Sequence, residues 1–286
     1  MRHTQIVLLE APGGCNMAHK HPACPALTLG RDKPCDHPHL LGRAFVTPKV
    51  TAVTPKVTAV TPFVTQFLPI KPETAVSLAI QLADMGFRGL YAFHWFSDPT
   101  TARPWVDDVV DGIRHEVKTA RFLLWTNGKN IQKPEWWKWV SGFDRIFISN
   151  YDGFDWHLLQ EMCGSRLFVW QDPVFEPLMR VPPNPDAPAS PVLCRRPFTE
   201  FTITRDGDVH LCCQAWRPEQ RIGNVFADGL ESCVRTFQRL RAQVALGAEP
   251  LSAGHICHGC ARPTPEIGTF EPQIAAETVK ELGLRE

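Results

Sequence analysis

Four cysteines in the C-terminal third of the sequence have a spacing that predicts a metal centre. In the segment "CRRPFTEFTITRDGDVHLC", Cys194 and Cys212 flank two strand-like stretches joined by an Asp-Gly turn. This pattern predicts a β-hairpin that brings its two end cysteines together. The segment "CHGC" adds Cys257 and Cys260. Four converging thiolates are typical of tetrahedral zinc and of iron-sulfur clusters, and the spacing alone does not choose between them.

A second cysteine-containing segment, "CNMAHKHPAC", follows the strand-like run "TQIVLLEAPGG" near the N-terminus. It begins at Cys15 and ends at Cys24, which precedes a proline, and Cys35 is the next thiol along the chain. The position of Cys15 directly after a strand is typical of a ligand loop, because side chains at the ends of buried strands often form sites.

Composition limits the kinds of protein to consider. The chain has 286 residues, 44% of them hydrophobic, and 30 acidic and 30 basic side chains. This predicts a globular protein of one or two domains and gives no electrostatic reason to expect nucleic acid or an anionic membrane as partner. The N-terminus has too few apolar residues for a signal peptide, so we expect a cytoplasmic protein. Ten cysteines in that compartment favour metal ligands or buried thiols over disulfides.

The elements that must position these cysteines alternate between strands and helices. Continuous apolar runs predict buried strands, and they cover 5–11, 89–96, 120–128, 144–153 and 166–172. Apolar residues at helical spacing predict helices over 73–87, 104–117 and 155–162. This order predicts an α/β fold with a parallel sheet, either doubly wound or bent into a partial or full barrel.

Two segments interrupt the alternation. Residues 46–66 repeat a seven-residue Thr-Pro unit and predict an extended excursion, because the prolines exclude a helix. Residues 173–193 are so rich in proline that they predict a linker. We therefore expect a first domain over 1–172 and a second over 194–286, the latter with a hairpin, a short strand and an amphipathic helix.

The segment "C…ITRDGDVHLC…IGNV…CHGC" resembles the twitch domain, a shortened SPASM domain, of radical S-adenosylmethionine enzymes. The N-terminal half is similar to the barrel of the same family, with "CNM" after the first strand, "FSDP" after the second, "TNG" after the third and "ISNYDG" at the fourth. The resemblance implies a partial parallel (β/α) barrel of about five to six strands. It also implies one auxiliary 4Fe-4S cluster held by Cys194, Cys212, Cys257 and Cys260.

The N-terminal loop departs from the Cys-x3-Cys-x2-Cys pattern of that family, because His19 and Pro22 occupy the second and third positions. Three arrangements remain open: a radical 4Fe-4S cluster on Cys15, Cys24 and Cys35, a cluster on two cysteines and a histidine (His19 or His21), or no cluster. Thiolate suits a low-potential cluster better than histidine, which favours Cys35 over His19.

The resemblance implies further contacts and an activity. Ser97, Asp98 and Pro99 correspond to a segment that approaches the amino group of S-adenosylmethionine, and Ser149 and Asn150 to residues near its ribose. The implied activity is reductive cleavage of this cofactor and hydrogen-atom abstraction from a small-molecule or peptide substrate, a net oxidation with flavodoxin or ferredoxin as electron donor. The alternative is a non-catalytic accessory protein that keeps the four-cysteine site for iron-sulfur or zinc.

Overall fold

The structure is a computed structural model that describes residues 1, 4–14, 70–95, 97–171, 199–211 and 221–245. The Thr-Pro repeat at 46–66 and the proline-rich segment at 173–193 lie outside these residues. So do all seven cysteines expected to bind metal, together with His19 and His21.

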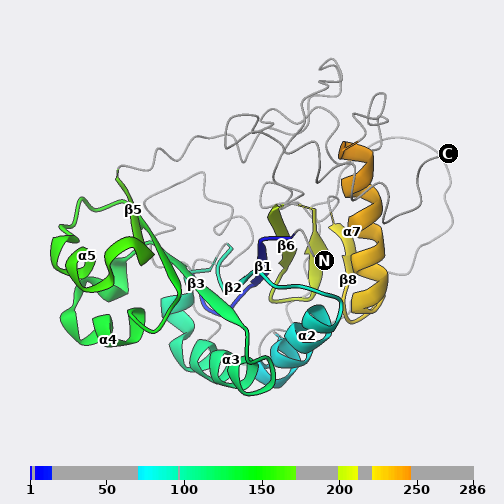
Figure 1. The fold of residues 1–286 in the computed structure, drawn as a ribbon, viewed down its shortest axis with the longest axis horizontal. Coiled ribbons are helices and arrows are strands. Elements are labelled where there is room, and N and C mark those ends of the chain that lie inside the picture. The colour runs from blue at the N-terminus through cyan, green and yellow to red at the C-terminus, as the bar shows by residue number, and fades with distance from the viewer. Residues whose placement is uncertain (2–3, 15–69, 96, 172–198, 212–220, 246–286) are drawn as a thin grey trace, which may run out of the picture.

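Eight strands form one open sheet in the order β5-β4-β3-β2-β1-β6-β7-β8 (Figure 1). Their bounds are β1 Ile6–Leu9, β2 Leu90–Ala92, β3 Arg121–Thr126, β4 Arg145–Asn150, β5 Leu167–Gln171, β6 Glu200–Ile203, β7 Asp208–His210 and β8 Arg221–Asn224. In this order, every neighbouring pair from β5 through β1 to β6 is parallel, whereas β6-β7 and β7-β8 are antiparallel. This confirms the predicted α/β class with a mostly parallel, unclosed sheet.

The five predicted strands of the N-terminal half are all present, and so are the three predicted helices. The helices are α2 Pro72–Asp84, α3 Arg103–Glu116, α4 Trp137–Val140, α5 His157–Cys163 and α7 Leu230–Ala245. Short 3-10 helices cover Pro99–Ala102, Lys129–Gln132, Pro134–Trp136 and Gly164–Arg166. None of the described helices has the length and apolar composition required to cross a bilayer.

The predicted hairpin is also present, as β6 and β7. Its turn contains Gly207, whose φ of +81° lies in the left-handed region that favours glycine. The hairpin is part of the barrel sheet, because β6 pairs in parallel with β1 over four residues, from Ile6–Glu200 to Leu9–Ile203. The division into two domains stays a prediction, and the described strands of both parts share one sheet.

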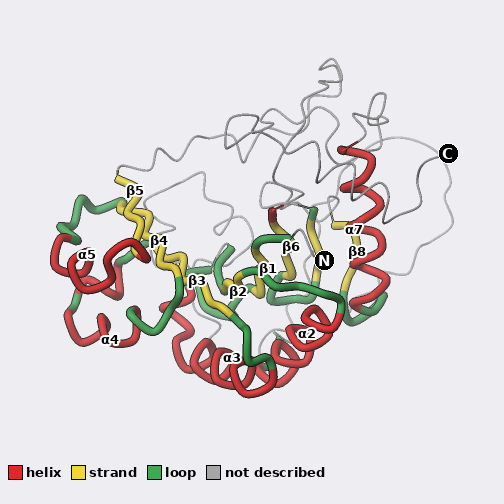
Figure 2. The backbone as a smooth tube through the Cα atoms, in the orientation of Figure 1, coloured by secondary structure: helices red, strands yellow, loops and turns green. Residues whose placement is uncertain are grey.

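The two faces of the sheet have different neighbours (Figure 2). The outer face packs against the helices and forms the main core, with Phe93, Phe122 and Phe201 fully buried among residues of α2, α3 and α7. The inner face carries a much smaller apolar cluster of Leu8, Ala92 and Leu123 near the middle of the strands. The sheet therefore has a helix-covered outer face and an inner face available for a site.

A contact between β6 and α7 allows the coupling of the two halves to be tested. The rings of Phe201 and Phe237 lie 4.9 Å apart in a T-shaped arrangement, and Phe237 is fully buried. Phe237→Ala should cost about 3–5 kcal/mol of unfolding free energy, because it removes a large buried side chain. Arg235→Ala, on the same helix but 66% exposed, should cost less than about 0.5 kcal/mol.

Tryptophan fluorescence during urea unfolding measures this coupling, since eight of the nine tryptophans precede residue 172. Phe237→Ala should shift the fluorescence transition and the far-UV circular dichroism transition together, because β6 is hydrogen-bonded to β1. A fluorescence midpoint that stays at the wild-type value would contradict one cooperative sheet.

Candidate active site at the carboxyl edge of the sheet

The chain that leads from β1 to Cys15 is held by the loop after β2. Ser97 Oγ donates to the Ala11 carbonyl oxygen at 2.8 Å, and the Asp98 N–H donates to the Gly14 carbonyl oxygen at 3.0 Å. The Thr101 hydroxyl lies 2.9 Å from the same Gly14 oxygen. The last residue before Cys15 therefore has a fixed position at the carboxyl edge of the sheet.

Glycine at position 13 is required by this close approach. A Cβ atom on Gly13 would lie 2.0 Å from Thr101 Oγ1 and 3.1 Å from Ala102 Cβ. The turn of the β6-β7 hairpin contacts the same segment from the other side, because Arg205 N donates to Glu10 Oε2 at 3.2 Å. The loops that follow β2 and β6, the two strands that flank β1, thus both contact the segment that precedes Cys15.

The Asp98 carboxylate holds the ends of β2 and β3 together. Its Oδ1 accepts from the Thr100 N–H at 2.9 Å and from the Thr100 hydroxyl at 2.5 Å. Its Oδ2 accepts from the Asn127 N–H at 2.8 Å and from the Thr126 hydroxyl at 2.9 Å. Burial raises the pKa of Asp98, and these hydrogen bonds oppose that shift because they favour the ionised form.

The structure gives Ser97 and Asp98 positioning contacts with protein groups, and Pro99 begins the buried 3-10 helix that follows. Their predicted contact with S-adenosylmethionine stays a prediction. Ser149 Oγ accepts from Trp125 Nε1 at 3.2 Å at the end of β4. Asn150 next to it is nearly fully buried and bonds to both the N–H and the carbonyl oxygen of Phe154, which shapes the loop after β4.

A row of rings crosses the inner face of the sheet from β2 to β5. His94, two residues beyond the inward-facing Ala92, contacts Trp125 with ring centroids 4.6 Å apart. Trp125 contacts Phe147 at 4.2 Å, and Phe147 stacks on Phe168 at 4.9 Å. Phe168 is 57% exposed, so the row ends in an open surface at the edge strand β5. We call these four residues the ring row.

Burial lowers the pKa of His94 to about 3, because the protein interior disfavours the imidazolium ion. The imidazole is therefore neutral at physiological pH. Sequence reasoning missed His94 and Trp125 as site residues. The signal was present in "YAFHWF" and "FLLWTNG", where His94 takes the inward alternate position just after β2 ends and Trp125 takes it just before β3 ends. A buried parallel strand conceals this pattern because both of its faces are apolar.

The described residues contain no group of three or more histidine, cysteine or acidic side chains placed to hold a metal ion. The seven predicted cysteine ligands lie outside that part of the chain. Cys163 and Cys233 are free and buried. Burial raises the pKa of Cys233 to about 11, so it is an unreactive thiol.

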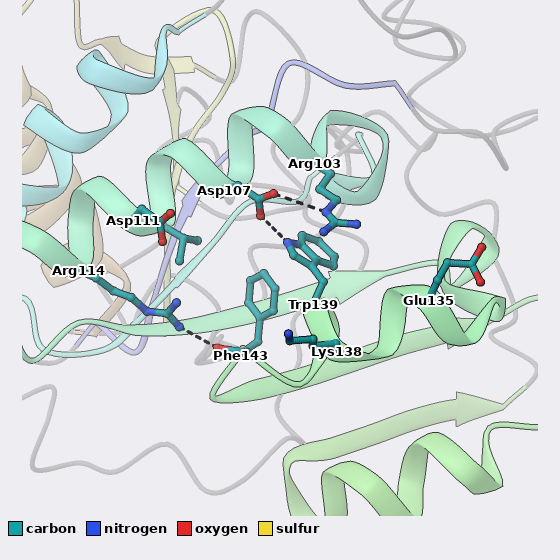
Figure 3. Close-up of a pocket in the computed structure, with 10 residues that line it drawn as sticks. Arg103, Asp107, Asp111, Arg114, Glu135, Lys138, Trp139 and Phe143 are labelled. Carbon is teal, nitrogen blue, oxygen red and sulfur yellow. Dashed lines mark hydrogen bonds and ion pairs between the residues drawn. The ribbon is translucent and has the colours of Figure 1, made fainter.

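A pocket of about 520 Å³ lies on the outer, helical side of the fold, between α3 and α4 (Figure 3). Arg103 and Trp139 both contact Asp107 there, through an ion pair at 3.5 Å and an indole N–H donor respectively. Arg114 donates to the Gly142 carbonyl oxygen at 2.7 Å. These pairings join α3 to α4 and to the turn after it, so Arg103, Asp107 and Arg114 have structural roles here.

The Asp98 network makes a testable prediction about stability. Asp98→Ala removes the acceptor for two buried N–H groups and should cost about 2–4 kcal/mol of unfolding free energy, measured by urea denaturation. Asp155→Ala is the matched control, because Asp155 also accepts a backbone N–H, from His157 at 2.9 Å, but is exposed to water. The control should cost less than about 1 kcal/mol. Equal losses in the two variants would show that the buried network has no special role.

Comparisons with known proteins agree with this geometry. Residues 194–261 match the SPASM family, described as an iron-sulfur cluster-binding domain. The fold is similar to that of BtrN in complex with AdoMet and 2-DOIA, with a TM-score of 0.61 and 14% identity over 94% of this chain and 96% of that one. It is also similar to selenomethionine BtrN in an open conformation, with a TM-score of 0.58 and 15% identity over 94% and 97% of the two chains.

No match to this chain was found among curated protein sequences. The resemblance to radical S-adenosylmethionine enzymes with a SPASM-type domain is confirmed at the level of the fold and of the C-terminal domain. Residues 194–261 of this chain match the model of the SPASM iron-sulfur cluster-binding domain, and the chain has an open α/β fold similar to that of BtrN.

Proposed function

We propose that this chain is a radical S-adenosylmethionine enzyme that oxidises a small-molecule substrate with the help of an auxiliary 4Fe-4S cluster. One observation carries the proposal: the segment after β1 is held at the carboxyl edge of the sheet as far as Gly14, the residue before Cys15, in a chain whose residues 194–261 match the SPASM family. The complex of BtrN with AdoMet supports the same cofactor here. When bound, a radical 4Fe-4S cluster supplies the electron for reductive cleavage of S-adenosylmethionine, which leads to hydrogen-atom abstraction.

The fixed position of Gly14 supports Cys15 as the first cluster ligand. Two groups of the β2 loop contact the Gly14 carbonyl oxygen, so the backbone enters the cysteine loop in one orientation. Cys24 and Cys35 would complete a three-thiolate set, which leaves one iron for the cofactor. Three thiolates suit a low-potential cluster better than a set that includes His19.

The hairpin supports an auxiliary cluster on Cys194, Cys212, Cys257 and Cys260. Cys212 directly follows Leu211, which is one residue beyond β7 and is buried. Because β6 is parallel to β1 and β7 returns antiparallel to it, the chain reaches Leu211 while running toward the amino edge of the sheet. Gly14, the last described residue before Cys15, lies at the opposite, carboxyl edge.

Four thiolates leave no iron site of the auxiliary cluster open for a substrate ligand. This supports electron transfer to that cluster over direct binding of the substrate to it. The role that fits is acceptance of the electron left on the substrate, which makes the net reaction an oxidation. Flavodoxin or ferredoxin would supply the electron for cofactor cleavage.

The alternative is a non-catalytic accessory protein that keeps only the SPASM-type site. The observation that favours it is the cysteine loop itself, where His19 and Pro22 occupy positions that are cysteines in radical S-adenosylmethionine enzymes. In that case the C-terminal cysteines would bind iron-sulfur or zinc for structural reasons.

Cofactor cleavage distinguishes the two functions. Anaerobically reconstituted protein, reduced with dithionite, should convert S-adenosylmethionine to 5'-deoxyadenosine and methionine, measured by liquid chromatography. Cys15→Ala should abolish the product because it removes a ligand of the radical cluster, and it should leave the auxiliary cluster absorbance intact. His19→Ala is the matched control from the same loop and should keep the activity.

Loss of cleavage in His19→Ala with retention in Cys15→Ala would overturn the three-cysteine assignment. Wild-type protein that holds two clusters by iron analysis and yields no 5'-deoxyadenosine would favour the accessory function.

The auxiliary site makes a separate prediction. Cys257→Ala or Cys260→Ala should remove about four iron atoms per chain and lower the thermal stability, because a small metal-bound segment depends on its metal for stability. Iron and sulfide analysis with visible absorption would measure the loss, and Cys163→Ala, at a free buried thiol, is the control that should keep all iron. Purified protein with stoichiometric zinc and no charge-transfer absorption would contradict the cluster.

A further inference from the structure

We propose that the edge strand β5 is an interface for a second copy of this chain. The two β5 strands pair antiparallel about a two-fold axis at Val169, and they join two open sheets into one. This dimer is independent of the radical chemistry proposed above. Three features carry it: the composition of the edge, the apolar side chains gathered around it and the self-complementary pattern of its five residues.

The first feature is an open edge without the usual protection. Within the described part of the chain, β4 is the only strand that pairs with β5, and β5 ends the sheet (Figure 1). Proteins protect free edges with charged side chains, prolines or bulges, because unpaired N–H and C=O groups are a template for another strand. The sequence of β5, Leu-Phe-Val-Trp-Gln, contains no charge and no proline, and its register with β4 is continuous.

The opposite edge strand, β8, has the protection that β5 lacks. It begins at Arg221, whose guanidinium pairs with Asp208 at 3.0 Å and stays half-exposed. A register shift between Val209 and His210 interrupts the pairing of β7 with β8, and α7 packs against β8. The two ends of the sheet are therefore built differently, and of the two β5 is the one suited to pair with another strand.

The second feature is a gathering of exposed apolar side chains at the β5 end of the sheet. Five large hydrophobic side chains of the described residues are exposed, and four of them belong to β5 or to α5 beside it: Phe168, Trp170, Leu158 and Met162. Phe168 and Trp170 expose 57% and 46% of their surface at alternate positions of β5. Both therefore lie on the inner face, where Phe168 stacks on Phe147. Contiguous apolar patches of this kind mark interaction sites.

The third feature is that β5 is complementary to itself. An antiparallel pairing that uses all five residues of both strands places Val169 opposite Val169 of the partner subunit. Phe168 then lies opposite Trp170 of the partner subunit, and the axis repeats this aromatic pair on the same inner face. The ring row, which ends at Phe168, thus continues onto Trp170 of the partner subunit. A two-fold contact also closes after two copies, which leaves no further edge to pair.

The size of the patch predicts a weak dimer. Phe168 and Trp170 each expose about half of a side chain that buries roughly 150–250 Å², so the two aromatic pairs enclose on the order of 400 Å² of ring surface. Backbone pairing and α5 add to this area, but the total belongs to the class of small interfaces below about 1,200 Å². We therefore expect a dissociation constant of about 1–100 µM.

Anaerobic sedimentation equilibrium of the reconstituted, full-length chain tests the dimer. The mass should rise with concentration toward twice the 32.2 kDa of one chain. Trp170→Lys should raise the dissociation constant about tenfold or more, because it places a charge on the paired edge. Its far-UV circular dichroism should match that of the wild type. Phe226→Lys is the matched control, since Phe226 is 42% exposed but follows β8, and it should keep the wild-type dissociation constant.

A cross-link tests the register. Val169→Cys should form a disulfide between subunits when a pyridyl disulfide is added anaerobically, because directly opposite residues of antiparallel strands lie within disulfide reach. Gln171→Cys is the control in the same strand. Its two copies would lie four residues apart along the paired strands, at about 13 Å, which is too far for a disulfide. Non-reducing gel electrophoresis measures both products.

Other results would overturn the inference. A mass of one chain at all concentrations up to about 300 µM would reject the dimer, because even a weak interface associates there. A dimer that Trp170→Lys leaves intact would place the interface elsewhere. A cross-link in Gln171→Cys without one in Val169→Cys would reject the axis at Val169. A mass that grows beyond two chains would reject a closed two-fold contact.

Discussion

The hydrogen bonds that join the ends of β1, β2 and β3 are the constraint on which the candidate site depends. The Asp98 carboxylate accepts a hydrogen bond from the N–H of Asn127 in the loop that follows β3. The Asp98 N–H donates to the carbonyl oxygen of Gly14 in the segment that follows β1. A single residue therefore sets the relative positions of three strand ends. Because its donors are mostly backbone N–H groups and short hydroxyls, the geometry leaves little freedom to the chain that enters Cys15.

The central position of β1 extends this constraint to the C-terminal part of the chain. β1 pairs in parallel on one side with β2 and on the other with β6. The hairpin that precedes Cys212 is consequently built onto the same strand that precedes Cys15. The two cysteine groups are thus connected through one short strand, and a change in the pairing of β1 would alter the approach to both.

Much of the fold follows from patterns that the sequence shows directly. Continuous apolar runs predict β1 to β5, and the Asp-Gly turn with Gly207 predicts the β6-β7 hairpin, because local chemistry dictates both. The pairing of β6 with β1 could not be predicted, since it joins residues almost 200 positions apart through backbone hydrogen bonds that carry no side-chain signature. The role of Asp98 was hidden for a similar reason: its four donors come from Thr100, Thr126 and Asn127, and two of those bonds depend on the neighbouring strand β3 or on the loop after it.

The ring row shows how a buried strand can serve two purposes. Phe93 and Phe122 face the helices, whereas His94, next to Phe93, and Trp125, three residues after Phe122, face inward. In sequence both kinds of residue are part of an apolar run, so only the three-dimensional alternation separates packing from recognition.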